Sequence, residues 1–135
     1  KLTKVLRVCM DKYAVANREF TAGFPDVPNL FEWFALNTKT TLVIPADGNY
    51  TIRLNSDDGS KLFLDKNDGK GYKLLINNDG IHPQAAVDKS VYLKKGEYLM
   101  VLNYFQGPRV FIALELFWLK PGKTHFEIIP RESFK

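Results

Sequence analysis

The chain has 135 residues, of which 45% are hydrophobic and 25% are charged. These values are ordinary for a single globular domain with its own core, and they exclude a disordered, collagen-like or coiled-coil chain. The net charge of +4 permits acidic partners without requiring them. One cysteine, Cys9, excludes an internal disulfide framework and a Cys-rich zinc site, but it does not decide the cellular compartment.

No segment of the sequence is long and apolar enough for a transmembrane helix. The longest apolar stretch, Val110–Leu119, is interrupted by Glu115 and is too short to cross a bilayer. Residues Lys1–Met10 also lack the apolar core and small-residue cleavage site of a signal peptide. We therefore expect neither feature within this sequence.

Hydrophobic residues alternate along the chain with a period of two, which is typical of strands. Each of three segments presents an apolar face: Tyr50, Ile52 and Leu54; Tyr98, Met100, Leu102 and Tyr104; and Val110, Ile112, Leu114, Leu116 and Trp118. The last segment is also apolar on its other face, so we expect it to be a central strand covered by two layers.

Turn residues separate the apolar segments, mostly as Asp-Gly pairs such as Asp58-Gly59 and Asp79-Gly80. The pattern predicts about ten short strands, at Leu6–Cys9, Phe31–Leu36, Thr41–Ile44, Asn49–Asn55, Lys61–Asp65, Tyr72–Ile76, Val87–Leu93, Tyr98–Phe105, Val110–Lys120 and His125–Ile129. No long amphipathic helix competes with them. The expected fold is a single all-β domain over residues 1–135, an antiparallel β-sandwich or barrel.

Motifs for catalysis are missing from the sequence. It contains no G-x-S-x-G nucleophile elbow and no phosphate-binding loop. His82 and His125 lack neighbouring ligands at metal-binding spacing, so His82 is interpreted as a surface residue. The sequence indicates no base that would activate Cys9 as a nucleophile, so Cys9 is interpreted as a small buried hydrophobe. Basic residues are scattered and most aromatic residues fall on core-facing strand positions, so we expect no nucleic-acid partner.

Two segments are rich in acidic residues. The segment Asp65–Gly69 resembles a calcium loop only faintly, because its glycine comes one place early and no closing Glu follows, so we interpret it as a hairpin turn. The second segment holds the adjacent pair Asp57-Asp58 at a corner between strands. Adjacent carboxylates repel each other and are tolerated best around a cation, and hard oxygen ligands from Asp57, Asp58 and Asn103 suit calcium. The alternative is a solvated turn with both Asp side chains exposed.

The segments YTIRLNSDDGSKLFLD and VYLKKGEYLMVLNYFQGPRVFIALELFW resemble the protective-antigen-fourteen domain family, named after the N-terminal region of anthrax protective antigen. The preceding FEWFALNTKTTLVIPADGNYTI is also similar to the family. The resemblance runs from about Phe20 to Lys120. It implies a β-sandwich related to yeast flocculin and adhesin lectin domains.

In lectin members of that family, two consecutive Asp residues joined by a cis peptide bind calcium, and the calcium coordinates sugar hydroxyls. The resemblance therefore implies metal ligands at Asp57, Asp58 and, by a looser match, Asn103. Tyr104, Phe105, Gln106, Arg109 and the loop Asn77–Gln84 are candidates to line the pocket, although at least one of Tyr104 and Phe105 should pack in the core, because strand neighbours point in opposite directions.

The expected function is a non-catalytic module, secreted or in the cell envelope, that binds a glycan or cell-wall polysaccharide, with calcium as its cofactor. The alternative is an architectural or interaction domain that binds an envelope protein and has no sugar site. In that case the Asp pair would hold the corner through hydrogen bonds to backbone N–H groups. An enzyme is the least favoured hypothesis.

Overall fold

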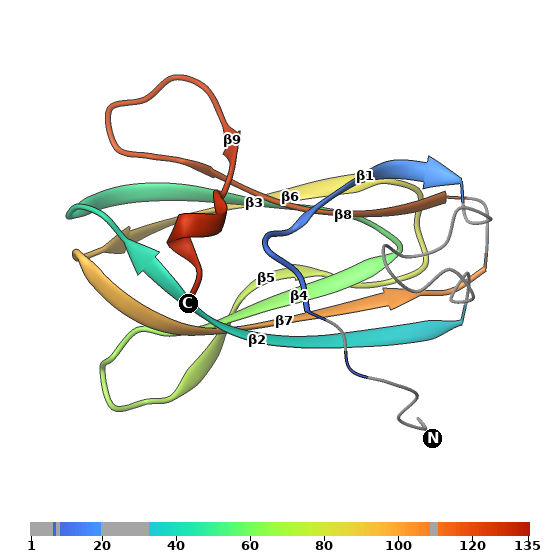
Figure 1. Cartoon of the computed structure of the whole chain (residues 1–135), viewed down its shortest axis with the longest axis horizontal. Helices are drawn as coiled ribbons and strands as arrows, with labels where there is room; N and C mark the ends of the chain where they lie inside the picture. Colours follow the sequence, from blue (N-terminus) through green and yellow to red (C-terminus); the bar gives the residue numbers. More distant parts are fainter. Residues whose placement is uncertain (1–6, 8, 20–32, 109–110) are drawn as a thin grey trace.

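A computed structural model describes residues 7, 9–19, 33–108 and 111–135. Within these ranges the chain forms strands and a single turn of 3-10 helix, and the strands stack as two layers (Figure 1). The strands are β1 (Ala14–Glu19), β2 (Phe34–Ile44), β3 (Gly48–Asp57), β4 (Gly59–Asp65), β5 (Tyr72–Asn78), β6 (Ala85–Leu93), β7 (Gly96–Gln106), β8 (Phe111–Leu119) and β9 (Glu127–Ile128). The predicted all-β sandwich is confirmed.

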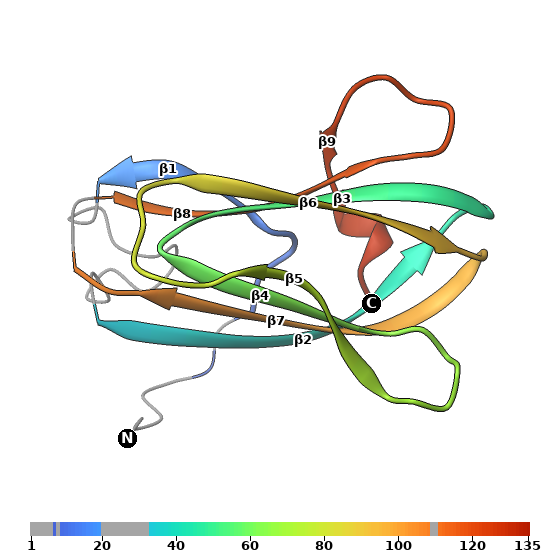
Figure 2. The same ribbon diagram turned by 180° about the vertical axis from the view of Figure 1, so that it is seen from behind.

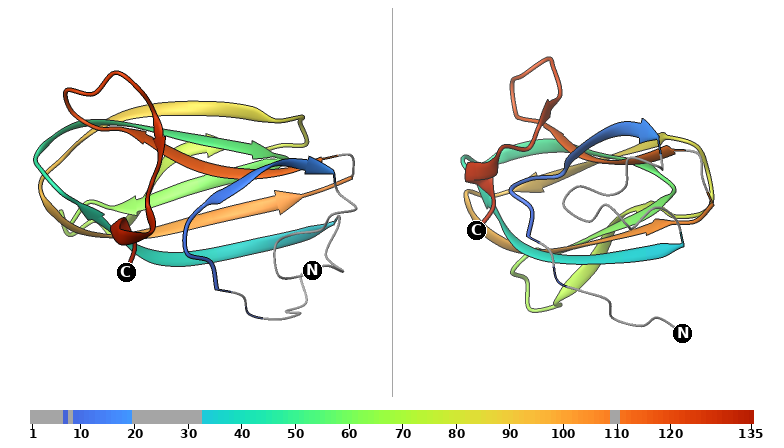
Figure 3. Two further views of the ribbon diagram at one scale, coloured as in Figure 1. Left: turned by 45° about the horizontal axis from the view of Figure 1, so that its top comes forward. Right: turned by 45° about the vertical axis from the view of Figure 1, so that its right-hand side comes forward.

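The two layers are antiparallel sheets, one of five strands and one of four among the described residues. One sheet has the order β1-β8-β3-β6, with β9 added beside β8, and the other has the order β2-β7-β4-β5. Two tilted views show the sheets facing each other, with the C-terminal segment at one edge (Figure 3). There, Lys135 exchanges backbone hydrogen bonds with Thr41.

The core is built from the alternating apolar residues of both sheets. Tyr50, Leu54, Met100, Leu114 and Trp118 are all buried, so the faces expected from the period of two are confirmed. Burying one such side chain contributes about 1.5–3 kcal/mol. Tyr104 is also buried while its neighbour Phe105 is half-buried on the outer face, as alternation requires.

Several predicted strands differ from the observed ones. The predicted segments Phe31–Leu36 and Thr41–Ile44 meet in one long strand, β2, because β7 pairs with it continuously from Phe34 to Ile44. Phe31 and Glu32 lie outside the described residues, and Trp33 precedes the strand. The strand β1 was missed, since AVANRE has only a weak apolar pattern. Of the predicted strand Leu6–Cys9, Arg7 and Cys9 are not part of a strand, and Leu6 and Val8 lie outside the described residues.

Two predictions about burial were wrong. Strand β8 is central in its sheet, but it is not covered on both faces, because Phe111 on its outer face is 40% exposed. Cys9 is exposed instead of buried. The predicted turn at Asp65–Gly69 does connect β4 to β5, where the Asp65 and Asp68 carboxylates accept N–H groups from Asn67 and Lys70.

The pairing register brings the ends of β3, β5 and β7 and the starts of β4 and β6 to one end of the sandwich. Ser56 at the end of β3 pairs with Ala85 at the start of β6, and Gly59 at the start of β4 pairs with Phe105 near the end of β7. Figure 2 shows the β3–β4 corner beside the β5–β6 connection at this end. The described residues include no helix long and apolar enough to cross a membrane.

Candidate functional site

The corner between β3 and β4 holds the Asp pair. A cis peptide joins Asp57 to Asp58. The hydroxyl of Ser56 donates to the carbonyl oxygen of Asp58 over 2.7 Å and lies 2.6 Å from the Ser60 hydroxyl. The corner is therefore closed by its own polar side chains.

The pair is buried, so the alternative of a solvated turn is wrong. Asp57 is 6% exposed and Asp58 is 3% exposed. The two oxygens of the Asp58 carboxylate accept the backbone N–H groups of His82, over 3.1 Å, and Gly107, over 2.7 Å. One side chain thus ties the β5–β6 loop and the residue after β7 to the corner, and the loop Asn77–Gln84 contributes the His82 contact.

The surroundings of Asp57 disfavour the charged form of its carboxylate. Burial, followed by the charge of Asp58 and a hydrogen bond with it, raises the pKa of Asp57 to about 6, although the charge of His82 and a backbone hydrogen bond from Gln84 oppose the shift. At neutral pH the Asp57 carboxylate therefore carries its charge in a nearly dry site beside a second acidic side chain, which is costly unless a cation or further donors approach.

Tyr104 and Gln106 support the corner from the core. The Tyr104 hydroxyl lies within hydrogen-bond distance of the Asp57 backbone oxygen and 2.7 Å from Gln106 Oε1. The Gln106 amide donates to the carbonyls of Pro108 and Phe111. Burial and the charges of the Asp pair raise the pKa of Tyr104, so it remains a neutral donor.

His82 is half-buried and both of its ring nitrogens contact loop carbonyls, so it is not the plain surface residue expected from the sequence. Its Nδ1 and Nε2 lie 2.7 Å from Pro83 O and 3.0 Å from Asn78 O. Burial lowers the pKa of His82, but these two carbonyls and the nearby Asp58 and Asp57 outweigh it, so the net pKa is raised. Only the protonated ring donates to both carbonyls.

The structure separates the six predicted binding residues. Asp57 and Asp58 lie together at the corner. Tyr104 and Gln106 are buried beneath it, where they position the pair and do not reach solvent. Asn103 lies on the outer face of the β2-β7-β4-β5 sheet, since it alternates with the buried Leu102 and Tyr104. Arg109 lies outside the described residues.

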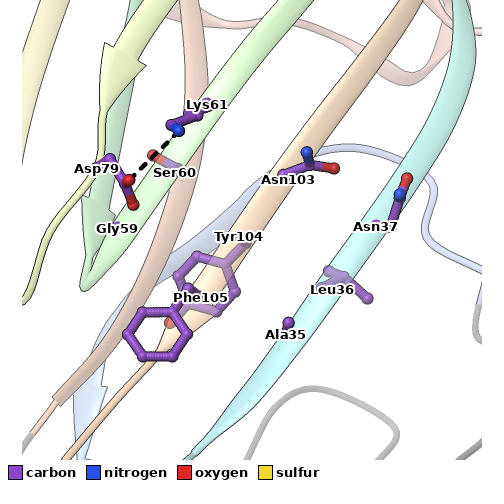
Figure 4. Close-up of a pocket in the computed structure, with 10 residues that line it drawn as sticks. All are labelled: Ala35, Leu36, Asn37, Gly59, Ser60, Lys61, Asp79, Asn103, Tyr104 and Phe105. Carbon is purple, nitrogen blue, oxygen red and sulfur yellow. Dashed lines mark ion pairs between the residues drawn. The ribbon is translucent and has the colours of Figure 1, made fainter. Parts of the chain in front are cut away.

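Asn103 instead lines a hollow of about 340 Å³ on the outer face of that sheet. Figure 4 shows Asn103 between Asn37 of β2 and the Lys61–Asp79 ion pair, with Phe105 nearby. The period of two indicates that these strand residues face outward, but only the pairing register places Asn37, Asn103 and Lys61 in one row. Sequence reasoning therefore missed this hollow.

The chemistry of the Asp pair fits calcium in part. Two adjacent carboxylates supply the charge and oxygen ligands that the ion prefers, out of the roughly six to eight ligands that it takes. Within the described ranges, however, no group of three or more His, Cys, Asp or Glu side chains gathers around one point. Asp57 and Asp58 would hold the ion, with water or backbone oxygens as the other ligands.

Solved structures with the same fold include PA14 domains. The chain is 21% identical to an anti-sigma factor domain-containing protein (TM-score 0.73), and the match covers 90% of this chain and 40% of that one. It is 11% identical to the PA14 domain of the antifreeze protein MpAFP (TM-score 0.63; 90% and 69% covered). It is 19% identical to a PA14 sugar-binding domain from an RTX adhesin (TM-score 0.55; 73% and 52% covered).

These likenesses show the fold, and the family is shown by a comparison with family models. A search of curated proteins found no match. The model of the PA14 domain matches residues 25–132, which is most of the chain and includes the Asp57–Asp58 corner. The chain therefore belongs to the PA14 domain family.

Proposed function

We propose that this PA14 domain is a non-catalytic module that binds a glycan, such as a cell-envelope polysaccharide, outside the cytoplasm. The proposed site is the Asp57–Asp58 corner, with Ca²⁺ held by the two carboxylates. The observation that carries the proposal is the burial of two adjacent acidic side chains, one of which has its pKa raised to about 6. A divalent cation would remove this repulsion, and a calcium ion with open coordination positions can take sugar hydroxyls. The likeness to a sugar-binding PA14 domain supports the glycan as ligand.

The first test is a thermal melt with calcium and with EDTA. Bound calcium stabilises the folded state by RT ln(1 + [L]/Kd), so we expect a rise in Tm of several degrees at millimolar calcium. Asp57→Asn, a neutral isostere, should abolish this rise. The matched control is Asp68→Asn in the β4–β5 turn, which removes an acidic side chain from an exposed turn and should leave the rise unchanged. No shift in the wild type would refute the calcium site.

Glycan binding is tested separately on a glycan array, with and without EDTA. The proposal expects binding that disappears in EDTA and in Asp57→Asn. Binding that persists in EDTA would place the sugar away from the corner.

A second candidate is an architectural or protein-interaction domain, which the hydrogen bonds of Asp58 favour. Both of its oxygens already accept backbone N–H groups, and together they link β3, the β5–β6 loop and β7. This arrangement stabilises the corner without any ligand. Absence of both a calcium shift and glycan binding would favour this candidate, and the partner would then be sought among envelope proteins by pull-down.

A further inference from the structure

The outer-face hollow has a shape set by the strand register. Two small residues, Ala35 and Gly59, pair with Phe105 from either side. The next row toward the middle of the sheet is Asn37, Asn103 and Lys61, whose side chains are longer. Ala35 leaves a depression on one side of Phe105, whereas Gly59 on the other side admits the Asp79 side chain and the Gly80 backbone, which come within 2.8 Å of where its Cβ would be. The hollow has a volume of about 340 Å³, within the usual range of small-molecule sites.

One aromatic ring lines this hollow, and a second ring packs against the first. Phe105 lines the hollow, and Trp33 meets the Phe105 ring edge-on at a centroid distance of 6.4 Å. Trp33 is 65% exposed, although it is the largest apolar side chain available for burial. Its backbone has φ 56°, a conformation that is rare for a bulky residue, and its N–H donates to the Gly107 carbonyl over 3.0 Å. The fold thus holds an indole in solvent beside the hollow.

The polar groups of the hollow are uncharged overall. Lys61 Nζ lies 3.4 Å from the Asp79 carboxylate, so the two charges of the lining cancel. The other polar side chains of the outer face here are the amides Asn37 and Asn103. The Oδ1 of Asn103 is covered and accepts no hydrogen bond, and a rotation about the soft terminal torsion of Asn would turn it toward a donor.

We propose that this hollow is a second binding site, specific for a neutral glycan chain and independent of calcium. Aromatic rings cover the apolar faces of sugar rings, and amides exchange hydrogen bonds with hydroxyl groups that both donate and accept. An anionic ligand would need a cationic side chain that is not already paired. The charge of Lys61 is balanced by Asp79, so the hollow does not favour such a ligand. The site includes neither Asp57 nor Asp58, so it does not depend on the function proposed for the corner.

The test is affinity electrophoresis in EDTA, with hydroxyethylcellulose, laminarin, galactomannan or dextran in the gel and polygalacturonate as the anionic comparison. At least one neutral polysaccharide should retard the wild-type chain. Trp33→Ala should weaken that binding about tenfold, which is the loss of one aromatic contact. Asn37→Ala, at an exposed position that leaves the core intact, should weaken it as well.

The matched control is Tyr92→Ala, which removes another exposed aromatic, 54% exposed on β6 of the opposite sheet, and should bind like the wild type. Retardation by no neutral polysaccharide, or by polygalacturonate alone, would overturn the proposal. Binding that requires calcium, survives Trp33→Ala and disappears in Asp57→Asn would also overturn it, while supporting the corner site. If the corner binds no calcium but the hollow binds glycan, retardation should persist in EDTA and Trp33→Ala should still weaken it.

Discussion

The Asp57–Asp58 corner and the outer-face hollow lie on either side of the start of β4. They differ in whether their polar groups have hydrogen-bond partners within the fold. At the corner, two acidic side chains are buried and the Asp58 carboxylate accepts two backbone N–H groups. At the hollow, the Asn103 amide oxygen has no partner, and the exposed Trp33 indole packs against Phe105, which lines it. The corner therefore contributes to the stability of the sandwich, whereas the hollow and its neighbouring indole offer polar and aromatic groups that the fold itself does not use.

Asp58→Ala is expected to have the largest effect on stability. It leaves the N–H groups of His82 and Gly107 without an acceptor, which should cost about 2–3 kcal/mol in the free energy of unfolding. Urea denaturation in EDTA at pH 7 measures this cost. The control in the hollow, Asp79→Ala, removes only an exposed ion pair and should cost less than about 0.5 kcal/mol. Equal effects would remove the distinction between the two regions.

The pH dependence of stability should depend on Asp57. Its pKa is raised from 3.8 to about 6 on folding, so between these values the folded state binds more protons than the unfolded state. Stability should therefore fall as the pH rises from about 4 to about 6, by about 1–2 kcal/mol. In Asp57→Asn this fall should be absent from urea denaturation curves recorded in EDTA. A variant with the same pH profile as the wild type would show that Asp57 is not the titrating group.

His82→Ala should have a smaller effect that also depends on pH. The pKa of His82 is raised in the folded state, so the stability from its protonated ring is fully present below about pH 6.5 and is lost as the pH rises through the folded value. We expect the variant to lose about 1 kcal/mol at pH 6 and less at pH 8. A loss that is constant across this range would show that the ring acts only by packing.

Asn103→Ala should have the smallest effect, within about 0.5 kcal/mol of the wild type in the same urea assay, because the Oδ1 that it removes has no hydrogen-bond partner. The matched control is Asn78→Ala at the corner. The Asn78 amide lies within hydrogen-bond distance of three acceptors, Leu54 O, Ser56 Oγ and Ala85 O. Its loss should cost about 2 kcal/mol. A large loss at Asn103 would contradict the assignment of the hollow as a region that the fold does not need.

The fold was largely predictable because its signals are local. Alternation along Tyr50–Leu54 and Tyr98–Tyr104 predicted both the strands and their buried faces, and the Asp-Gly pairs predicted where strands end. The strand β1 was not predictable in this way, because Ala14–Glu19 has only one buried position, Val15, and is held by pairing with β8.

The candidate sites were predictable only in part. The adjacent acids at a strand corner pointed to Asp57 and Asp58, with Asn103 as a further oxygen ligand, and the pocket implied by the resemblance added Tyr104 and Gln106. Strand pairing puts Tyr104 and Gln106 under the corner and Asn103 on the outer face. The sequence did not reveal the hollow, because its row of Asn37, Asn103 and Lys61 comes from three strands that are distant in the chain.

The sequence by itself determined the strands, the faces of most of them and the position of the acidic corner, because a period of two and turn chemistry are properties of neighbouring residues. Only the tertiary structure decided which strands pair, which loops meet Asp58 and which polar groups remain without partners. These features depend on register between distant segments, and a shift of one residue would send every side chain of a strand to the opposite face.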